Sequence, residues 1–381
     1  MHTAIRPSAG ALVLAALTLA GLTACGSGGT PTASGSAAPG KIAVAASDTE
    51  CKVAASEVAA GTTTFAITNG GSKVTEFYVY APGDRVMAEV ENIVPGLTRE
   101  LIAELPAGAY ETVCKPGMIG KGIRNALKVT GEHQALTADA KLADAVQSYK
   151  RYIKTQSDTL LVKTQEFVDA VKAGEIDRAK ELFPVSRTYW ERIEPVAEIF
   201  GDLDPAIDAR EADLAEGEEW TGFHRIEKDL WIHKDVSKDG PVADKLIADV
   251  KTIVTKANAA QLTPLNLANG AKELLDEVAT GKITGEEDIW SHTDLWDFDA
   301  NLEGSKAAVQ SLRPVLEERA PDLVKTLDEK FAAAEAALAV HQKGDGWRLH
   351  NELSKAELKT LSDAINALGE PISEVAPVVA K

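Results

Sequence analysis

The sequence predicts a small all-β sandwich followed by an all-α helical bundle, because the chain divides into two compositional regimes. Residues 42–131 contain short β-branched or aromatic runs separated by turn residues such as Asn69-Gly70-Gly71, a pattern typical of a sandwich. From residue 137 onward the apolar residues recur at helical spacing over long segments. Residues 137–381 are therefore predicted to form the helical domain.

Several residues predict where the helices begin and end. Thr137 is suited to cap a helix that runs to about Ala173, with Gly174 following it. Prolines further along mark expected helix starts or breaks. They are Pro184, Pro195, Pro205, Pro241, Pro264, Pro314 and Pro321.

The N-terminal segment predicts export and a lipid anchor. Arg6 precedes an apolar run over residues 11–22, which is too short for a permanent membrane span. Small residues then lead to Cys25, so residues 1–24 are interpreted as a lipoprotein signal peptide and Cys25 as the lipidated residue. An ordinary secretory signal with a chance cysteine is the alternative. Residues 25–41 are predicted to be a flexible tether on the outer face of the bacterial cytoplasmic membrane.

The acidic composition argues against one class of partner and is explained equally well by cation binding or by solubility alone. A net charge of −18 argues against nucleic acid, because phosphate binding needs Lys and Arg. The same charge is compatible with cation binding and with simple solubility. Beyond Cys25 the chain has two cysteines, Cys51 and Cys114. In an oxidising compartment they are expected either to form a disulfide or to ligate a metal.

The segment around His224 carries the clearest candidate for chemistry. His224 and Glu227 are three residues apart, so they project from one face of a helix and can share a metal ion. A buried hydrogen bond between them that orders the core is the competing interpretation. A zinc peptidase is disfavoured, because Lys228 follows Glu227 and no second histidine comes at a useful spacing.

Other carboxylates are candidates to complete such a site. Glu194 lies close to Trp190, and Asp294 and Asp297 share a predicted helical face beside Trp296. Neighbouring tryptophans favour partial burial of these acids, whereas a solvated face is the usual fate of acidic residues.

The motifs WTGFHRIE (220–227) and SHTDLWDF (291–298) resemble the imelysin-like domain of EfeO-type iron-uptake lipoproteins. The resemblance covers the chain beyond the tether and implies that His224 and Glu227 bind metal. It further implies a non-enzymatic carrier of ferric or ferrous iron, with a membrane iron permease and a secreted haem peroxidase as partners. Alternatives are a metallopeptidase, a carrier of copper, zinc or another divalent metal, and a carrier of an acidic polysaccharide, which the negative charge disfavours.

The resemblance also implies that residues 42–131 are cupredoxin-like, with Cys114 and Met118 in the loop where such domains bind copper. No histidine precedes His133 in this domain, so a blue-copper site is not expected. A modified site that uses Glu76, Cys51, Cys114 or Met118 is one hypothesis. A Cys51–Cys114 disulfide with Met118 as a packing residue is the other. Glu89 and Glu91 are predicted to point to one side of a strand, where they could bind a hard cation, but a solvated strand edge is the expected position.

Overall fold

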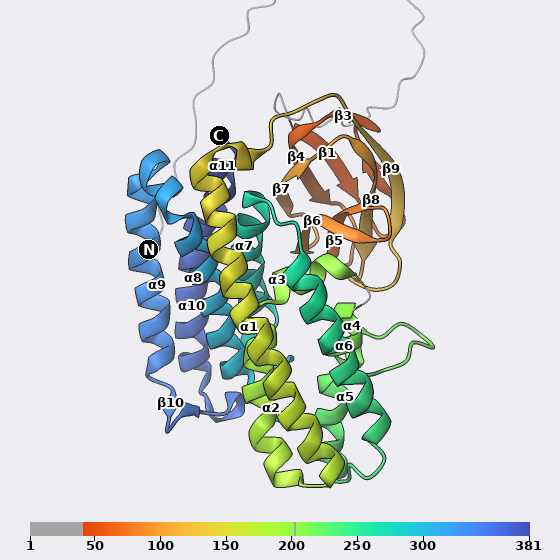
Figure 1. Cartoon of the computed structure of the whole chain (residues 1–381), viewed down its shortest axis with the longest axis vertical. Coiled ribbons are helices and arrows are strands. Elements are labelled where there is room, and N and C mark those ends of the chain that lie inside the picture. The colour runs from red at the N-terminus through yellow and green to blue at the C-terminus, as the bar shows by residue number, and fades with distance from the viewer. Residues whose placement is uncertain (1–40, 202) are drawn as a thin grey trace, which may run out of the picture. The chain divides into compact units, whose positions relative to one another are not determined.

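Two β-sheets pack face to face in the N-terminal half of the computed structural model, which describes residues 41–201 and 203–381 (Figure 1). The strand order is β2-β1-β4-β7 in one sheet and β3-β9-β8-β5-β6 in the other. The strands are β1 (Lys41–Ala46), β2 (Cys51–Val53), β3 (Glu57–Ala59), β4 (Gly61–Asn69), β5 (Thr75–Ala81), β6 (Arg85–Ile93), β7 (Thr98–Leu105), β8 (Gly108–Pro116) and β9 (Ile123–Thr130).

Alternating side chains build the core of the sandwich. Phe65 and Ile67 of β4 point inward from one sheet and meet Phe77 of β5 from the other. The rings of Phe65 and Phe77 lie 5.3 Å apart and both are fully buried. Burying side chains of this size contributes about 1.5–3 kcal/mol each, so this layer holds the two sheets together.

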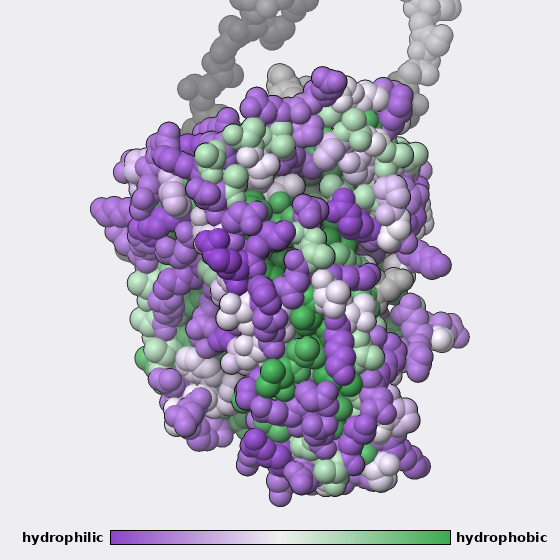
Figure 2. All heavy atoms as spheres, viewed as in Figure 1, coloured by the Kyte–Doolittle hydropathy of each residue, from purple (hydrophilic) through white to green (hydrophobic). Residues whose placement is uncertain are grey.

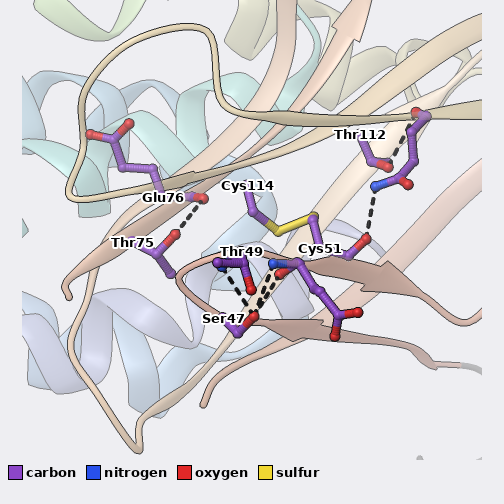
Figure 3. The surroundings of a disulfide bond; sticks show 9 residues. Ser47, Thr49, Cys51, Thr75, Glu76, Thr112 and Cys114 are labelled. Carbon is purple, nitrogen blue, oxygen red and sulfur yellow. Dashed lines mark hydrogen bonds between the residues drawn. A yellow bond between two sulfur atoms is a disulfide. The ribbon is translucent and has the colours of Figure 1, made fainter. Parts of the chain in front are cut away.

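A disulfide joins Cys51 of β2 to Cys114 of β8 and so links the two sheets (Figure 3). The bond closes a loop between cysteines 63 residues apart in sequence. Closing a loop of that length stabilises the fold by about 4 kcal/mol in the chain-entropy model. Both sulfur atoms are bonded in the disulfide, so neither cysteine supplies a thiolate to a metal.

Helices form the rest of the described chain. The longer ones are α1 (Ala140–Ala173), α2 (Ile176–Glu191), α6 (Gly240–Ala259), α7 (Pro264–Thr280), α8 (Asp294–Arg319), α9 (Pro321–Ala339) and α10 (Lys355–Ser373). Short ones are α3 (Glu194–Ala197), η2 (Glu198–Phe200), α4 (Leu203–Asp208), α5 (Phe223–Lys228), η4 (Asp229–His233), η5 (Lys282–Thr284) and α11 (Val375–Val379). A small hairpin, β10 (Gln342–Lys343) and β11 (Gly346–Trp347), follows α9.

The predicted helix boundaries are partly wrong. The α1 helix is capped by Asp139, whose carboxylate accepts the backbone N–H groups of Lys141 and Leu142, because Thr137 lies in the short turn before it. Its predicted end holds, with Gly174 in the left-handed region at φ 72°. Pro184 and Pro314 lie inside α2 and α8 and end neither helix.

The long helices pack side by side and cover one side of the sandwich at α7 (Figure 1). Asn269 of α7 donates a hydrogen bond to the Ile102 carbonyl of β7 over 3.0 Å, and Arg99 of β7 pairs with Asp276 of α7. Hydrophilic side chains cover most of the face drawn in Figure 2. Among the described residues, no helix combines the length and apolarity of a membrane span. The predicted fold class, sandwich followed by helical bundle, is confirmed.

Candidate metal centre

Gly222 fixes the backbone that carries the His224 motif. It stands immediately before α5 at φ 88°, a conformation that favours glycine. A Cβ atom there would lie 2.1 Å from the Ile207 carbonyl oxygen of α4. The preceding residues tie this turn to the same helix, because Thr221 Oγ1 donates to the Ala206 carbonyl over 2.7 Å and Trp220 Nε1 donates to the Ala209 carbonyl over 2.8 Å. Trp220 therefore lies before the helix and not on the face that carries His224 and Glu227.

The imidazole of His224 is surrounded by carboxylates. Its Nδ1 lies 3.0 Å from Glu227 Oε2 and 3.9 Å from Asp288 Oδ1. Its Nε2 lies 3.5 Å from both Asp208 Oδ1 and Glu287 Oε1. The His224, Glu227 and Asp288 side chains are at most 1% exposed. One buried imidazole thus faces four acidic side chains.

Glu227 is held in place through its second oxygen. Oε1 accepts the backbone N–H groups of Trp290, at 3.1 Å, and Ser291, at 2.7 Å. These residues belong to the loop that leads into α8, so the loop orients the carboxylate while Oε2 stays directed at His224. A ligand oriented by its other atom is characteristic of metal sites.

Arg187 of α2 is the principal counter-charge. It is fully buried and pairs with Glu191, Asp208 and Glu287. Its Nε also lies 3.4 Å from Asp288 Oδ1 and 3.6 Å from Asp297 Oδ1. One guanidinium cannot neutralise so many acids, and this leaves the centre with an excess of negative charge.

The pKa values reflect this excess. Burial raises the pKa of both Asp208 and Asp288 to about 6. Burial and Arg187 lower the pKa of His224, but the neighbouring carboxylates of Glu227, Glu287 and Asp208 outweigh them and raise it to about 10. In the absence of a metal ion, protons compensate part of the charge.

Two kinds of ligand geometry are present. Ligand atoms of His224, Glu227 and Asp288 lie within 4.8 Å of one another, and the same is true of His224, Asp208 and Glu287. The His224 Nε2 and Asp288 Oδ1 atoms are buried and have no hydrogen-bond partner among the described residues. Buried polar atoms are normally satisfied, so Asp288 Oδ1 in the first set, and His224 Nε2 in the second set once the ring is neutral, are each available to bind a cation.

The other predicted ligands lie in different places. Asp294 accepts a hydrogen bond from the Asp288 backbone N–H over 3.2 Å, and Asp297 is oriented toward Arg187. Both therefore contact residues that surround His224 and do not contact the imidazole itself. Glu194 lies elsewhere, with Glu191 around the ammonium group of Lys282. The three-residue spacing of Asp294 and Asp297 predicted that they share a helical face, and both lie near the site. No such spacing relates Glu194 to the site.

The hypothesis of a metal site in the β domain is wrong in its two cysteine ligands. Cys51 and Cys114 are disulfide-bonded, and Glu76 extends away from that bond on the opposite face of its strand (Figure 3). Its neighbour Phe77, not Glu76, pairs with Cys114. Met118 lies in the loop after β8 at φ 62°. Glu76 instead contacts Lys115, with its carboxylate 3.7 Å from that Nζ atom.

The sequence interpretation missed Asp208, Glu287, Asp288 and Arg187. They come from three separate segments of the chain, and nothing in their local pattern marks them as neighbours of His224. The run Glu286-Glu287-Asp288, which ends two positions before Trp290, was the available signal. Glu191 beside Trp190 and Asp297 beside Trp296 are also buried, whereas Glu219 beside Trp220 is exposed.

Fold and site together define a protein that joins a cupredoxin-like sandwich to a helical domain with a buried histidine–carboxylate centre. The imelysin family model matches residues 145–375, and the model for a cupredoxin-like domain matches residues 11–123. The chain therefore belongs to the imelysin family, among the EfeO-type proteins that combine both domains.

Curated relatives agree with this assignment. The "Iron uptake system component EfeO" of Escherichia coli O157:H7 is 38% identical over 89% of this chain and 91% of its own length. The proteins of the same name from E. coli K12 and Shigella flexneri are each 37% identical over the same shares. A solved structure of a putative iron-regulated protein A precursor from Parabacteroides distasonis covers 65% of this chain and 97% of its own, at 12% identity and a TM-score of 0.46.

Proposed function

We propose that this chain is the extracytoplasmic iron-binding component of a bacterial iron-uptake system, and that the His224 centre holds the iron. The convergence of one buried imidazole with four carboxylates is the observation that supports this best. Imidazole and carboxylate donors suit iron. The names of the relatives point to the same cargo.

Of the two ligand sets, His224, Glu227 and Asp288 form the better one. Asp208 and Glu287 lie closer to Arg187 than Asp288 does, whose Oδ1 is 3.4 Å from the Arg187 Nε atom, and Glu227 forms no ion pair with that residue. Asp288 Oδ1 has no hydrogen bond to the described chain. Asp208 and Glu287 then supply charge around the Nε2 side of the ring, and Asp294 and Asp297 position the others.

A role as carrier fits the burial of the centre better than peptide hydrolysis does. A metallopeptidase needs an open coordination position that a peptide can reach. His224 is 1% exposed and Glu227 is fully buried, so the imidazole ring is not accessible to a polypeptide substrate. The proposed activity is binding and transfer, without a chemical step.

Metal titration of residues 37–381, which form one compact unit, tests this proposal. Ferric and ferrous iron, zinc and copper are each added, and bound metal is counted by elemental analysis after dialysis. One iron ion per chain that is retained through dialysis is expected. Retention of copper or zinc with no bound iron would assign the centre to another metal.

The affinity of the centre is expected to rise with pH. At neutral pH the His224 ring is protonated, because its pKa is about 10, and only the neutral ring binds metal. Binding must then release that proton, which strengthens affinity by roughly tenfold per pH unit up to that pKa. The same raised pKa stabilises the metal-free fold below about pH 6.5, and this contribution is lost as pH rises toward 10.

Calorimetry in buffers of different ionisation enthalpy measures the proton count directly. His233→Ala is the matched control, because it removes a half-exposed imidazole outside the centre and should release as many protons as the unaltered chain. Metal binding at neutral pH without release of a proton would show that the His224 ring is not the group that titrates.

We also propose that the chain is anchored by a lipid on Cys25 and passes iron to a membrane permease, with a secreted haem peroxidase as a second partner. Cys25 lies outside the residues that the structure describes, so the lipobox pattern alone supports the anchor. The residue that carries the lipid must be a cysteine, because its sulfur forms the bond.

Cys25→Ala is therefore expected to release the protein from membranes or to leave it unprocessed. Cell fractionation with immunoblotting measures this, and Ser34→Ala, a change in the predicted tether, serves as the control. Equal membrane attachment of Cys25→Ala and the unaltered chain would refute the anchor.

A further inference from the structure

The four carboxylates around His224 differ in how close they lie to solvent. Glu227 and Asp288, on the Nδ1 side of the ring, have fully buried side chains. Asp208 and Glu287, on the Nε2 side, are the more exposed pair, and the Glu287 side chain is 11% exposed. The centre therefore lies closest to solvent on the side of Glu287.

Glu287 lies between the centre and a second arginine, Arg210. Its Oε1 atom is 3.5 Å from His224 Nε2 and 2.9 Å from Arg187 Nη2. Its other oxygen, Oε2, is 3.8 Å from Arg210 Nη1. The same Nη1 atom donates to Oε1 of the half-exposed Glu286 over 3.1 Å. Arg210, whose side chain is 25% exposed, thus covers Glu287 on the side away from the imidazole.

Arg210 belongs to the α4–α5 loop, residues 209–220, which projects from the helices (Figure 1). Trp220 closes this loop at its base, because its Nε1 atom donates to the Ala209 carbonyl. Leu214, the largest apolar residue between these two, is only partly buried and does not join the hydrophobic core. A segment with so few buried apolar contacts opens at a low free-energy cost.

Ion pairs hold the α4–α5 loop against the rest of the protein. Besides Arg210, Glu211 connects the loop to its surroundings by pairing with Lys228 of α5. A further pair stays within the loop, because Arg210 Nε and Nη2 donate to the two carboxylate oxygens of Asp213 over 2.7 and 3.0 Å. When the outer contacts break, Arg210 can move away together with Asp213, so its charge stays paired while Glu287 is uncovered.

We propose that Arg210 and the α4–α5 loop form a gate over the metal centre, which opens to admit or release the ion and closes with Arg210 on Glu287. The proposal rests on the function proposed above, because it requires a metal ion at His224. In the closed state the guanidinium repels an approaching cation, so entry and release both require Arg210 to leave Glu286 and Glu287. Exposed ion pairs are individually weak, which suits contacts that break and form again with each ion.

Two substitutions that change the local charge in opposite directions test the gate. Arg210→Met removes a positive charge beside the centre and Glu286→Gln removes a negative one, yet both break a contact that holds the loop closed. Electrostatics alone predicts slower release of a cation from Arg210→Met and faster release from Glu286→Gln. A gate predicts faster release from both, by about 2–10-fold, because each variant loses exposed pairs that stabilise only the closed state.

The measurement uses residues 37–381 loaded with ferrous iron under nitrogen and mixed with an excess of a coloured ferrous chelator. Colour formation gives the rate of release, and competition with the same chelator gives the affinity. Faster release from Arg210→Met without loss of affinity means that entry is faster too, as a gate requires. The melting temperature of the metal-free variants should stay unchanged. Arg178→Met removes an exposed arginine paired with Glu181 on α2, so this matched control should release iron like the unaltered chain.

Slower or unchanged release from Arg210→Met would overturn the gate and leave Arg210 as a charge beside the centre. If that variant does not fold, Lys228→Met replaces it, because it also removes a positive charge and frees the loop at Glu211.

Failure of the gate and failure of the proposed function give different results. Iron that is retained, with release rates unchanged in the variants, refutes the gate alone. If the unaltered chain retains zinc and no iron, the proposed function fails, and the same rates measured with zinc and a coloured zinc chelator still test the gate. A chain that binds no metal overturns both.

Discussion

Replacing His224 with Ala is expected to abolish iron binding at the helical centre while the fold persists. The ring is the one donor shared by both possible ligand sets, so no rearrangement of the carboxylates restores it. Glu227→Ala should weaken binding nearly as much. Loss of an outer-shell partner alone weakens a metal site about 10–100-fold, and loss of a direct ligand should exceed that.

Metal affinity and thermal stability together decide between binding and packing. If the His224–Glu227 contact only orders the core, both variants should melt at a lower temperature without metal and bind iron as before. His233→Ala is the matched control, because it removes a half-exposed imidazole nine positions along the same segment. Asp208→Asn should weaken binding less than Glu227→Ala, and the reverse order would favour the ligand set on the Nε2 side.

Arg187→Met is expected to destabilise the metal-free protein by about 3–5 kcal/mol, because it leaves several buried carboxylates without their main counter-charge. Methionine fills similar volume, so the loss reflects charge more than packing. Added iron should restore a large part of this stability, since a cation that binds only the folded state stabilises it.

Chemical unfolding with and without iron measures both effects. Arg313→Met, which removes an arginine that is paired with Asp328 on the surface, is the control and should change stability by less than about 1 kcal/mol. If iron stabilises Arg187→Met no more than it stabilises the unaltered chain, Arg187 does not compensate the charge of the metal site.

The sequence predicted the two-domain fold because apolar residues recur with a strand period in the N-terminal domain and with a helix period in the C-terminal domain. Alternation in segments such as Thr62–Thr68 and helical spacing beyond residue 137 each depend on local side-chain direction alone. Helix ends were harder to predict. Thr137 and Asp139 are both good capping residues, and only the packing of α1 decides which of them caps it.

The sequence predicted only those residues of the candidate site that lie on the same helix. His224 and Glu227 are neighbours through a single turn, so their spacing contained the information. Asp208, Glu287 and Asp288 reach the centre through tertiary packing, which no local pattern records. Glu89 was assigned to solvent for the same reason, because helix α7, far along the chain, is what covers its strand.

The tryptophans next to the centre give the protein a built-in optical reporter. The Trp290 backbone N–H is bonded to Glu227, and its ring lies 5.9 Å from that of Trp220. Residues 42–131 contain no tryptophan, so indole emission belongs to the helical domain alone. Loading and unloading of a quenching ion such as iron can therefore be followed in real time in the unlabelled protein, and the dwell time of the cargo becomes a measurable property.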